Sequence, residues 1–215
     1  MKGVAALALL LVTLITGCAS AGHRLAPKVI RQVAPGMTRE QVQSLVGEAT
    51  ASESGPDGRR IDTYVYQLEQ AAARDDLIID PGHYRLAGTF LHRLLTVLYS
   101  ESGVVERAKF SETQTPYYVA VEVLPNWTRR KWVGKEMTPE IIDSIKRGVT
   151  TAAEIELVLG EPTWLSLSVK GDEIHGWLYG QLVGRGTMET RWSILAVQYD
   201  DNKVVKELRF HTEPR

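Results

Sequence analysis

The chain of 215 residues has one cysteine, three phenylalanines and no large excess of charge of either sign. A single cysteine cannot form an internal disulfide, so the fold must be stabilised by buried apolar surface, which 44% hydrophobic residues can supply. The formal net charge of −1 gives no reason to expect nucleic acid as a partner, because nucleic-acid binders carry a basic surface. Beyond the N-terminal segment, no stretch reaches the roughly 18 uncharged apolar residues of a membrane-spanning helix.

Motifs for catalysis and for metal binding are also missing from the sequence. The five histidines, at positions 23, 83, 92, 175 and 211, do not have the spacing of metal ligands. There is no Gly-x-Ser-x-Gly sequence around a nucleophilic serine and no glycine-rich loop of the kind that binds phosphate. We therefore expect no catalytic residues, no metal and no cofactor, and an enzyme is the least supported of the functions considered.

The N-terminal segment is typical of a secretory signal. A basic residue, Lys2, precedes an apolar run at residues 4–14, and the small residue Gly17 directly precedes Cys18. The sequence from Ile15 to Cys18 resembles the lipobox of bacterial lipoproteins, in which the cysteine becomes the first mature residue and carries lipid. The resemblance implies a signal peptide at residues 1–17, lipid attachment at Cys18 and a lipidated tether at residues 18–26. An ordinary signal peptide followed by a chance cysteine is the alternative.

The residue after the cysteine bears on the location of the protein. Ala19 stands there instead of an aspartate, which resembles lipoproteins that are sorted to an outer membrane. We expect a lipid anchor in the outer membrane with the body of the protein facing the periplasm. The outer face of the cytoplasmic membrane is the alternative.

Two parts of the chain have the same predicted order of elements. A helix that starts near a proline is predicted at residues 27–33 and again at 139–145, and Gly36 and Gly148 follow as left-handed residues. A second helix starts at a capping box in each part, and from that cap the apolar positions correspond without a gap. The corresponding residues are Thr38, Gln41, Val42, Leu45, Val46 and Gly47 in the first part, and Thr151, Glu154, Ile155, Val158, Leu159 and Gly160 in the second.

Alternating and β-branched residues predict strands after each helix pair. The matched strands are residues 61–66 and 174–179, 95–99 and 195–199, and 104–110 and 204–210, with weaker strands at 49–54 and 163–169. The pattern predicts an α+β fold of two tandem units, each with two helices followed by an antiparallel meander. The helices should cover one face of each sheet and leave the other face at least partly open.

The comparison of the two parts also predicts the domain boundaries. The first domain spans residues 27–110 and the second spans 139–215, with a linker at 111–138. The first domain has 13 additional residues between its second and third strands, which places an insertion at residues 67–94. Long connections between strands are uncommon unless they are functional or disordered.

The helix caps and their glycines resemble a known family. The segment from Gly36 to Gly47 resembles the signature of the BamE (SmpA/OmlA) family of outer-membrane lipoproteins, and residues 148–162 resemble the same signature with its common proline ending. The doubled architecture is similar to the fold of the β-lactamase inhibitor protein. Membership implies a periplasm-facing accessory or scaffold protein in outer-membrane protein assembly. Its partner is then an envelope protein, with components of the barrel-assembly machinery among the candidates, although two units depart from the family's usual single unit.

Two groups of residues are candidates for binding a partner. Large aromatic rings project to one side of the matched strands, where they form either a core or a partner surface. These residues are Tyr64, Tyr66, Trp177 and Tyr179. The linker also combines aromatic and basic residues, which suits lipid headgroups or an acidic protein surface, with a solvated linker as the alternative. These residues are Trp127, Arg129, Arg130 and Trp132.

Two functions are therefore better supported by the sequence than an enzymatic one. The first is a lipid-anchored envelope scaffold that binds another protein, with membrane contact through Cys18. The second is an inhibitor or ligand-binding module in which the two sheets form one concave surface.

Overall fold

A computed structural model describes residues 20–22, 25–71, 85–122, 128–185 and 187–212. The fold class is α+β, as the sequence predicts. The expected signal peptide and Cys18 lie outside the described residues. Within the described residues, no helix is long and apolar enough to span a membrane.

Two pairs of short helices start where the prolines and capping boxes predict. The first pair is α2 (Pro27–Ile30) and α3 (Arg39–Val46), and the second is α4 (Pro139–Ser144) and α5 (Ala152–Leu159). Thr38 and Gln41 form a capping box at α3, and Thr151 and Glu154 form one at α5, so free backbone N–H groups at both helix starts are satisfied.

The strands form one antiparallel sheet with the order β1-β3-β4-β5-β6-β8-β9-β10, to which β2 is added along β3 and β7 along β8. The strands are β1 (Ser20–Gly22), β2 (Ala51–Ser54), β3 (Arg60–Ala71), β4 (Arg85–Tyr99), β5 (Val105–Glu122), β6 (Thr128–Val133), β7 (Trp164–Leu167), β8 (Glu173–Arg185), β9 (Thr187–Tyr199) and β10 (Val205–Thr212). Strand β6 pairs with β5 on one edge and β8 on the other, and so joins the two halves of the sheet.

Parts of the expected insertion and linker are strands, which differs from the sequence prediction. Strands β3 and β4 stay in register as far as the pair Ala71 and Gly88, so residues 67–71 and 88–94 extend a hairpin. Residues 85 and 86 of β4 pair with β5. Residues 72–84 of the insertion lie outside the described part. In the expected linker, residues 111–122 belong to β5 and 128–133 to β6. The comparison of the two parts predicts strands only where both parts have matching residues. The residues outside that match lengthen β3, β4 and β5, where their backbone groups find hydrogen-bond partners on neighbouring strands.

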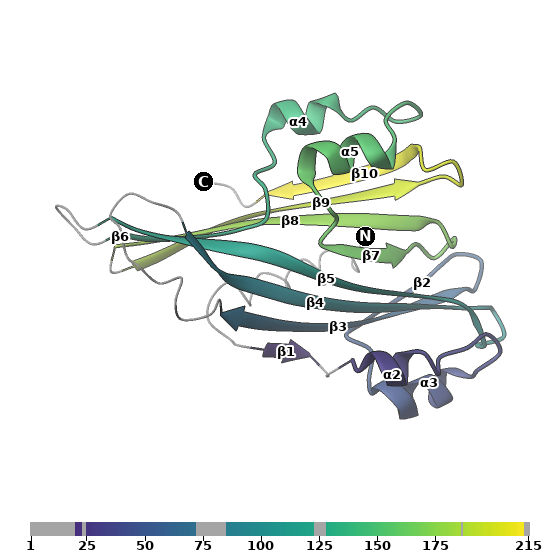
Figure 1. The fold of residues 1–215 in the computed structure, drawn as a ribbon. Helices are drawn as coiled ribbons and strands as arrows, with labels where there is room; N and C mark the ends of the chain where they lie inside the picture. The colour runs from purple at the N-terminus through teal and green to yellow at the C-terminus, as the bar shows by residue number, and fades with distance from the viewer. Residues whose placement is uncertain (1–19, 23–24, 72–84, 123–127, 186, 213–215) are drawn as a thin grey trace.

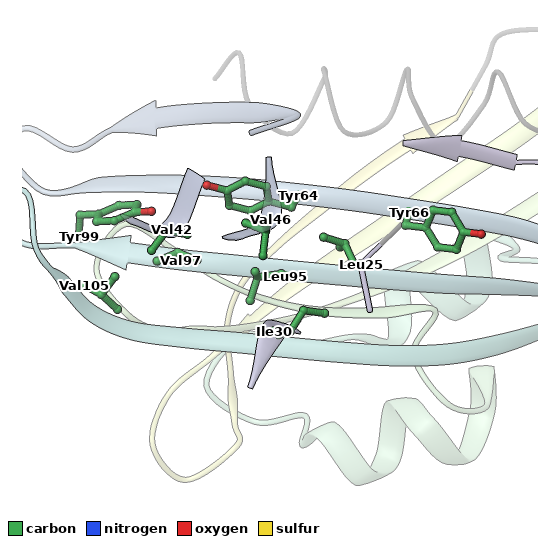
Figure 2. Packing of buried hydrophobic residues seen from close by; sticks show 10 residues of the cluster. All are labelled: Leu25, Ile30, Val42, Val46, Tyr64, Tyr66, Leu95, Val97, Tyr99 and Val105. Carbon is green, nitrogen blue, oxygen red and sulfur yellow. The ribbon is translucent and has the colours of Figure 1, made fainter. Parts of the chain in front are cut away.

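Each helix pair covers a core on one face of the strands. In the first half, Val42 of α3 packs with Tyr64, Leu95 and Val97 of β3 and β4 (Figure 2). In the second half, Ile155 of α5 belongs to a cluster that holds the strand residues Trp177, Leu195, Val197 and Tyr199. The two helix pairs lie on opposite sides of the molecule, with the strands between them (Figure 1).

The faces of the strands that carry no helices pack against each other. Ile61 of β3 and Leu98 of β4 form a buried cluster with Leu167 of β7, and Val169 packs against it. The buried hydroxyls of Thr96 and Ser166 share a hydrogen bond of 2.9 Å across this contact. The expectation of a partly open face is therefore wrong at this contact, because apolar residues occupy both alternations of β3 and β4 and both faces become buried.

We predict that the hydroxyl pair between the halves is energetically coupled. The single substitutions Thr96→Val and Ser166→Ala should each lower the free energy of unfolding by about 1–3 kcal/mol, because the remaining hydroxyl loses its buried partner. The double variant should lose less than the sum of the two single losses. Urea unfolding of the four proteins measures this coupling, and additive losses would show that the two hydroxyls do not interact.

Candidate functional site

Three of the four aromatic residues proposed for partner binding are core residues. Tyr64, Tyr66 and Trp177 are 1%, 9% and 4% exposed. Tyr179 is partly buried and packs against the second core. Of the two interpretations of this aromatic set, the structure supports core packing, because α2, α3, α4 and α5 cover the side of the strands to which the rings project.

The basic and aromatic segment of the expected linker belongs to the sheet. Arg129, Arg130 and Trp132 lie on β6, and Trp127 lies outside the described residues. Both edges of β6 are paired, since Arg130 is opposite Ala120 of β5 and Val183 of β8. The backbone of this segment is therefore engaged in joining the halves.

A buried carboxylate organises the first half. Asp62 is completely buried and accepts hydrogen bonds from Arg39 Nε at 2.7 Å, Arg60 Nε at 3.1 Å and Ser52 Oγ at 2.5 Å. The hydrogen bond to Asp62 raises the pKa of Arg39. These contacts tie α3 and β2 to β3. One feature of the sequence signals these contacts, an acidic residue at an inward position of an otherwise apolar alternation.

At the matching strand position, the second half has His175 in place of a carboxylate. Its Nδ1 lies 3.3 Å from Glu156 Oε1, and its ring lies 4.7 Å from the ring of Tyr199. Burial lowers the pKa of His175, and the nearby Glu156 opposes this shift. Among the residues that the structure describes, no group of three His, Cys, Asp or Glu side chains could hold a metal ion.

A buried polar pair lies between the two halves. Gln67 and His92 are opposite each other on β3 and β4 and are 2% and 5% exposed. Thr163 and Trp164 of the second half line the same small space. Within the described part of the chain, neither ring nitrogen of His92 has a hydrogen-bond partner. Burial lowers the pKa of His92 to about 4, so the ring is neutral at neutral pH.

A groove of about 460 Å³ opens beside the contact between the halves. One wall is β2 with the neighbouring part of β3, and the opposite wall is formed by β8, β9 and β10. Trp164 of β7 lies between these walls, and its ring packs so closely on Gly176 that a Cβ at that position would come within 1.9 Å of the ring. The glycine thus leaves space for a flat aromatic surface beneath the groove.

The groove combines apolar and charged residues. Ile61, Val169, Ile174 and Ala196 contribute apolar surface. Its charged residues are four cations, Arg147, Lys170, Lys206 and Arg209, and two carboxylates, Glu53 and Glu207. The volume and the mixture of surfaces are typical of a binding site. Sequence reasoning missed this groove, because its walls come from segments more than 100 residues apart.

A second surface feature lies on the helices of the second half. The large hydrophobic residues Val149, Leu157 and Val158 are 71%, 85% and 40% exposed. Leu157 and Val158 are neighbours on α5, and Val149 precedes that helix. Exposed apolar residues in one region are a common property of protein contact surfaces.

Comparison with known families identifies the first half. Residues 22–108 match the model of the outer membrane protein assembly factor BamE domain, which supports a BamE-like domain in this part of the chain. No curated protein and no solved structure matches the chain significantly.

We predict that His92 makes stability depend on pH. Its folded pKa of about 4 lies below the ordinary value of 6.5, so between these values the unfolded chain binds a proton that the folded protein does not. The contribution of the neutral His92 ring to the free energy of unfolding is fully present above pH 6.5. It is lost as the pH falls towards 4, by up to roughly 1.4 kcal/mol per pH unit. Urea unfolding between pH 7 and 4 measures the slope.

The variant His92→Leu provides the comparison for this measurement. It removes the titrating ring and leaves the other ionisable groups, so its stability should fall less steeply over the same pH range. Equal slopes in the two proteins would exclude His92 as a source of the pH dependence.

Proposed function

We propose that the protein is a lipid-anchored, non-enzymatic scaffold of the bacterial envelope that binds another envelope protein. The observation that carries this proposal is the BamE match at residues 22–108, whose family is described by its role in outer membrane protein assembly. The partner is an envelope protein, and the barrel-assembly machinery supplies the first candidates.

The proposed anchor is lipid on Cys18. The signal-like segment before it and the residues Ile15 to Cys18 support this assignment. Each acyl methylene buried in a membrane contributes about 0.8 kcal/mol, so several acyl chains on one cysteine hold a protein stably at the membrane. The proposed location is the outer membrane with the body facing the periplasm, with the outer face of the cytoplasmic membrane as the alternative.

We also propose that residues 139–215 form a second unit of the same design as residues 27–110. Three observations support this proposal. Both helix pairs carry a capping box at the second helix, Gly36 and Gly148 both have positive φ, and the cores use matched positions such as Leu95 with Leu195 and Val97 with Val197. The second unit would then serve as an additional contact module beside the BamE-like domain.

The groove favours one alternative function, a ligand-binding or inhibitory module. In this alternative, the concave surface is the groove between β2 and the strands of the second half. Such a module should bind its target equally well with and without the membrane anchor, whereas an anchored scaffold depends on its position at the membrane.

The lipid anchor predicts the behaviour of a Cys18→Ser variant. The wild-type protein should sediment with membranes, and the variant should lose most of this association because no acyl chain is attached. Fractionation of cells followed by immunoblotting measures the distribution. The conservative variant Ser20→Ala, two residues away, should remain with the membranes, and equal sedimentation of Cys18→Ser and wild type would contradict lipid attachment at Cys18.

Partner binding is tested by crosslinking in intact cells followed by mass spectrometry. We expect the wild-type protein to capture a defined envelope protein, with weaker capture by Cys18→Ser when the fold is unchanged. The scaffold proposal would be refuted if the membrane-bound protein crosslinked to no envelope protein.

A further inference from the structure

The groove runs along the free edge of β2. Three consecutive residues of this strand, Ala51, Ser52 and Glu53, line it. Successive side chains of a strand point to opposite faces, so three in a row can border one groove only where the groove follows the edge of the strand. In the described part of the chain, β2 pairs with β3 alone, and its other edge therefore presents unpaired backbone groups.

The opposite wall suits the side chains of an extended segment. Ile174 and Ala196 supply an apolar surface beside the buried indole of Trp164, while Gln198 supplies a polar group. An extended peptide that pairs with β2 would direct every second side chain towards this wall. A volume of about 460 Å³ accommodates a few such side chains and no larger folded element.

The charges of the groove favour an acidic occupant. Lys206 pairs with Asp172 at 2.9 Å, and Arg209 pairs with Glu207 at 3.3 Å. Arg147 and Lys170 are exposed, and neither has a salt-bridge partner among the described residues. Both are thus available to carboxylates of a ligand. Glu53 of β2 is exposed and also has no salt-bridge partner among the described residues, so two unpaired cations face one unpaired carboxylate. The remaining positive charge favours encounter with an acidic segment.

We propose that this groove binds an extended acidic segment of a partner protein. The segment adds a strand to the free edge of β2, places apolar side chains against Ile174 and Ala196, and directs carboxylates towards Arg147 and Lys170. The proposal rests on the proposed function as a protein-binding scaffold and specifies the chemistry of its partner. An anionic lipid would match the cations but could not pair with the backbone of β2.

The test uses the full mature lipidated chain in nanodiscs of phosphatidylcholine. The probe is a fluorescein-labelled hexapeptide in which valine alternates with glutamate. The first control peptide has lysine in place of glutamate, and the second has N-methyl groups on alternate backbone amides, which removes hydrogen-bond donors. Fluorescence anisotropy should show saturable binding of the glutamate peptide and at least about tenfold weaker binding of each control.

Variants of the protein then locate the site. Lys170→Glu should weaken binding of the glutamate peptide about tenfold and improve binding of the lysine peptide. Arg31→Glu makes the same sign of charge change at an exposed position outside the groove and should bind like wild type. Ala196→Trp fills the groove and should abolish binding, with circular dichroism and urea unfolding to verify that the variant is folded.

Several results would overturn the proposal. These are the absence of saturable binding, equal binding of the N-methylated peptide, or wild-type binding by Lys170→Glu. Binding to phosphatidylglycerol vesicles that depends on Lys170, without peptide binding, would assign the groove to lipid instead. Capture of an envelope partner by a protein that fails the peptide test would refute the groove as the binding site and leave the scaffold function standing. Peptide binding without any envelope partner would refute the scaffold function and leave the groove as a peptide-binding site.

Discussion

The contact between the two helix-free faces determines the rest of the structure. Each helix pair can cover only one face of its strands, and β3 and β4 carry apolar residues on both alternations. The second face is buried when the short strand β7 packs across β4 and β5, with Leu167 against Leu98. Side-chain hydroxyls of β5 form hydrogen bonds with backbone groups at the edge of β7 that pairs with no strand among the described residues. Leu165 N–H donates to Ser111 Oγ at 3.1 Å, and the hydroxyl of Thr113 donates to the carbonyl of Thr163. An edge that would otherwise expose backbone groups is therefore satisfied inside the molecule.

This contact also determines which surface is available for binding. The aromatic rings that suggest a partner surface are used for the two cores, and the sheet faces that suggest an open concave surface are largely used for packing. The groove where β2 diverges from the strands of the second half stays open beside this contact. Ion pairs such as that between Lys109 of β5 and Glu173 of β8 join the halves beside it. The groove is thus a product of the joined halves, and neither half would contain it alone.

Local features of the fold could be predicted from the sequence with good accuracy. The capping boxes at Thr38 and Thr151, the left-handed glycines at positions 36 and 148 and the matched strands depend on residues close together in the chain. The sequence pattern underestimates the lengths of β3, β4 and β5, because their polar outer parts become strands only through pairing with distant neighbours.

The candidate site could not be predicted in the same way. Whether Tyr64 and Trp177 face a core or a partner depends on which face the helices cover, and the alternation alone does not specify that face. The groove unites Glu53, Trp164 and Lys170 from separate segments, so no local pattern signals it. The sequence shows an acidic residue, Asp62, within a predicted strand. It does not show that this residue pairs with Arg39 and so links α3 to β3.

The most direct test of this account is disulfide formation between the two halves. Thr96 and Ser166 have hydroxyl oxygens 2.9 Å apart, so cysteines at these positions, in a protein with Cys18→Ser, should be close enough to form a disulfide. Mild oxidation followed by mass spectrometry of proteolytic fragments should recover a peptide pair linked through positions 96 and 166. If both thiols remained free in the folded, oxidised protein, the helix-free faces would not be in contact, and the groove beside them would not exist as described.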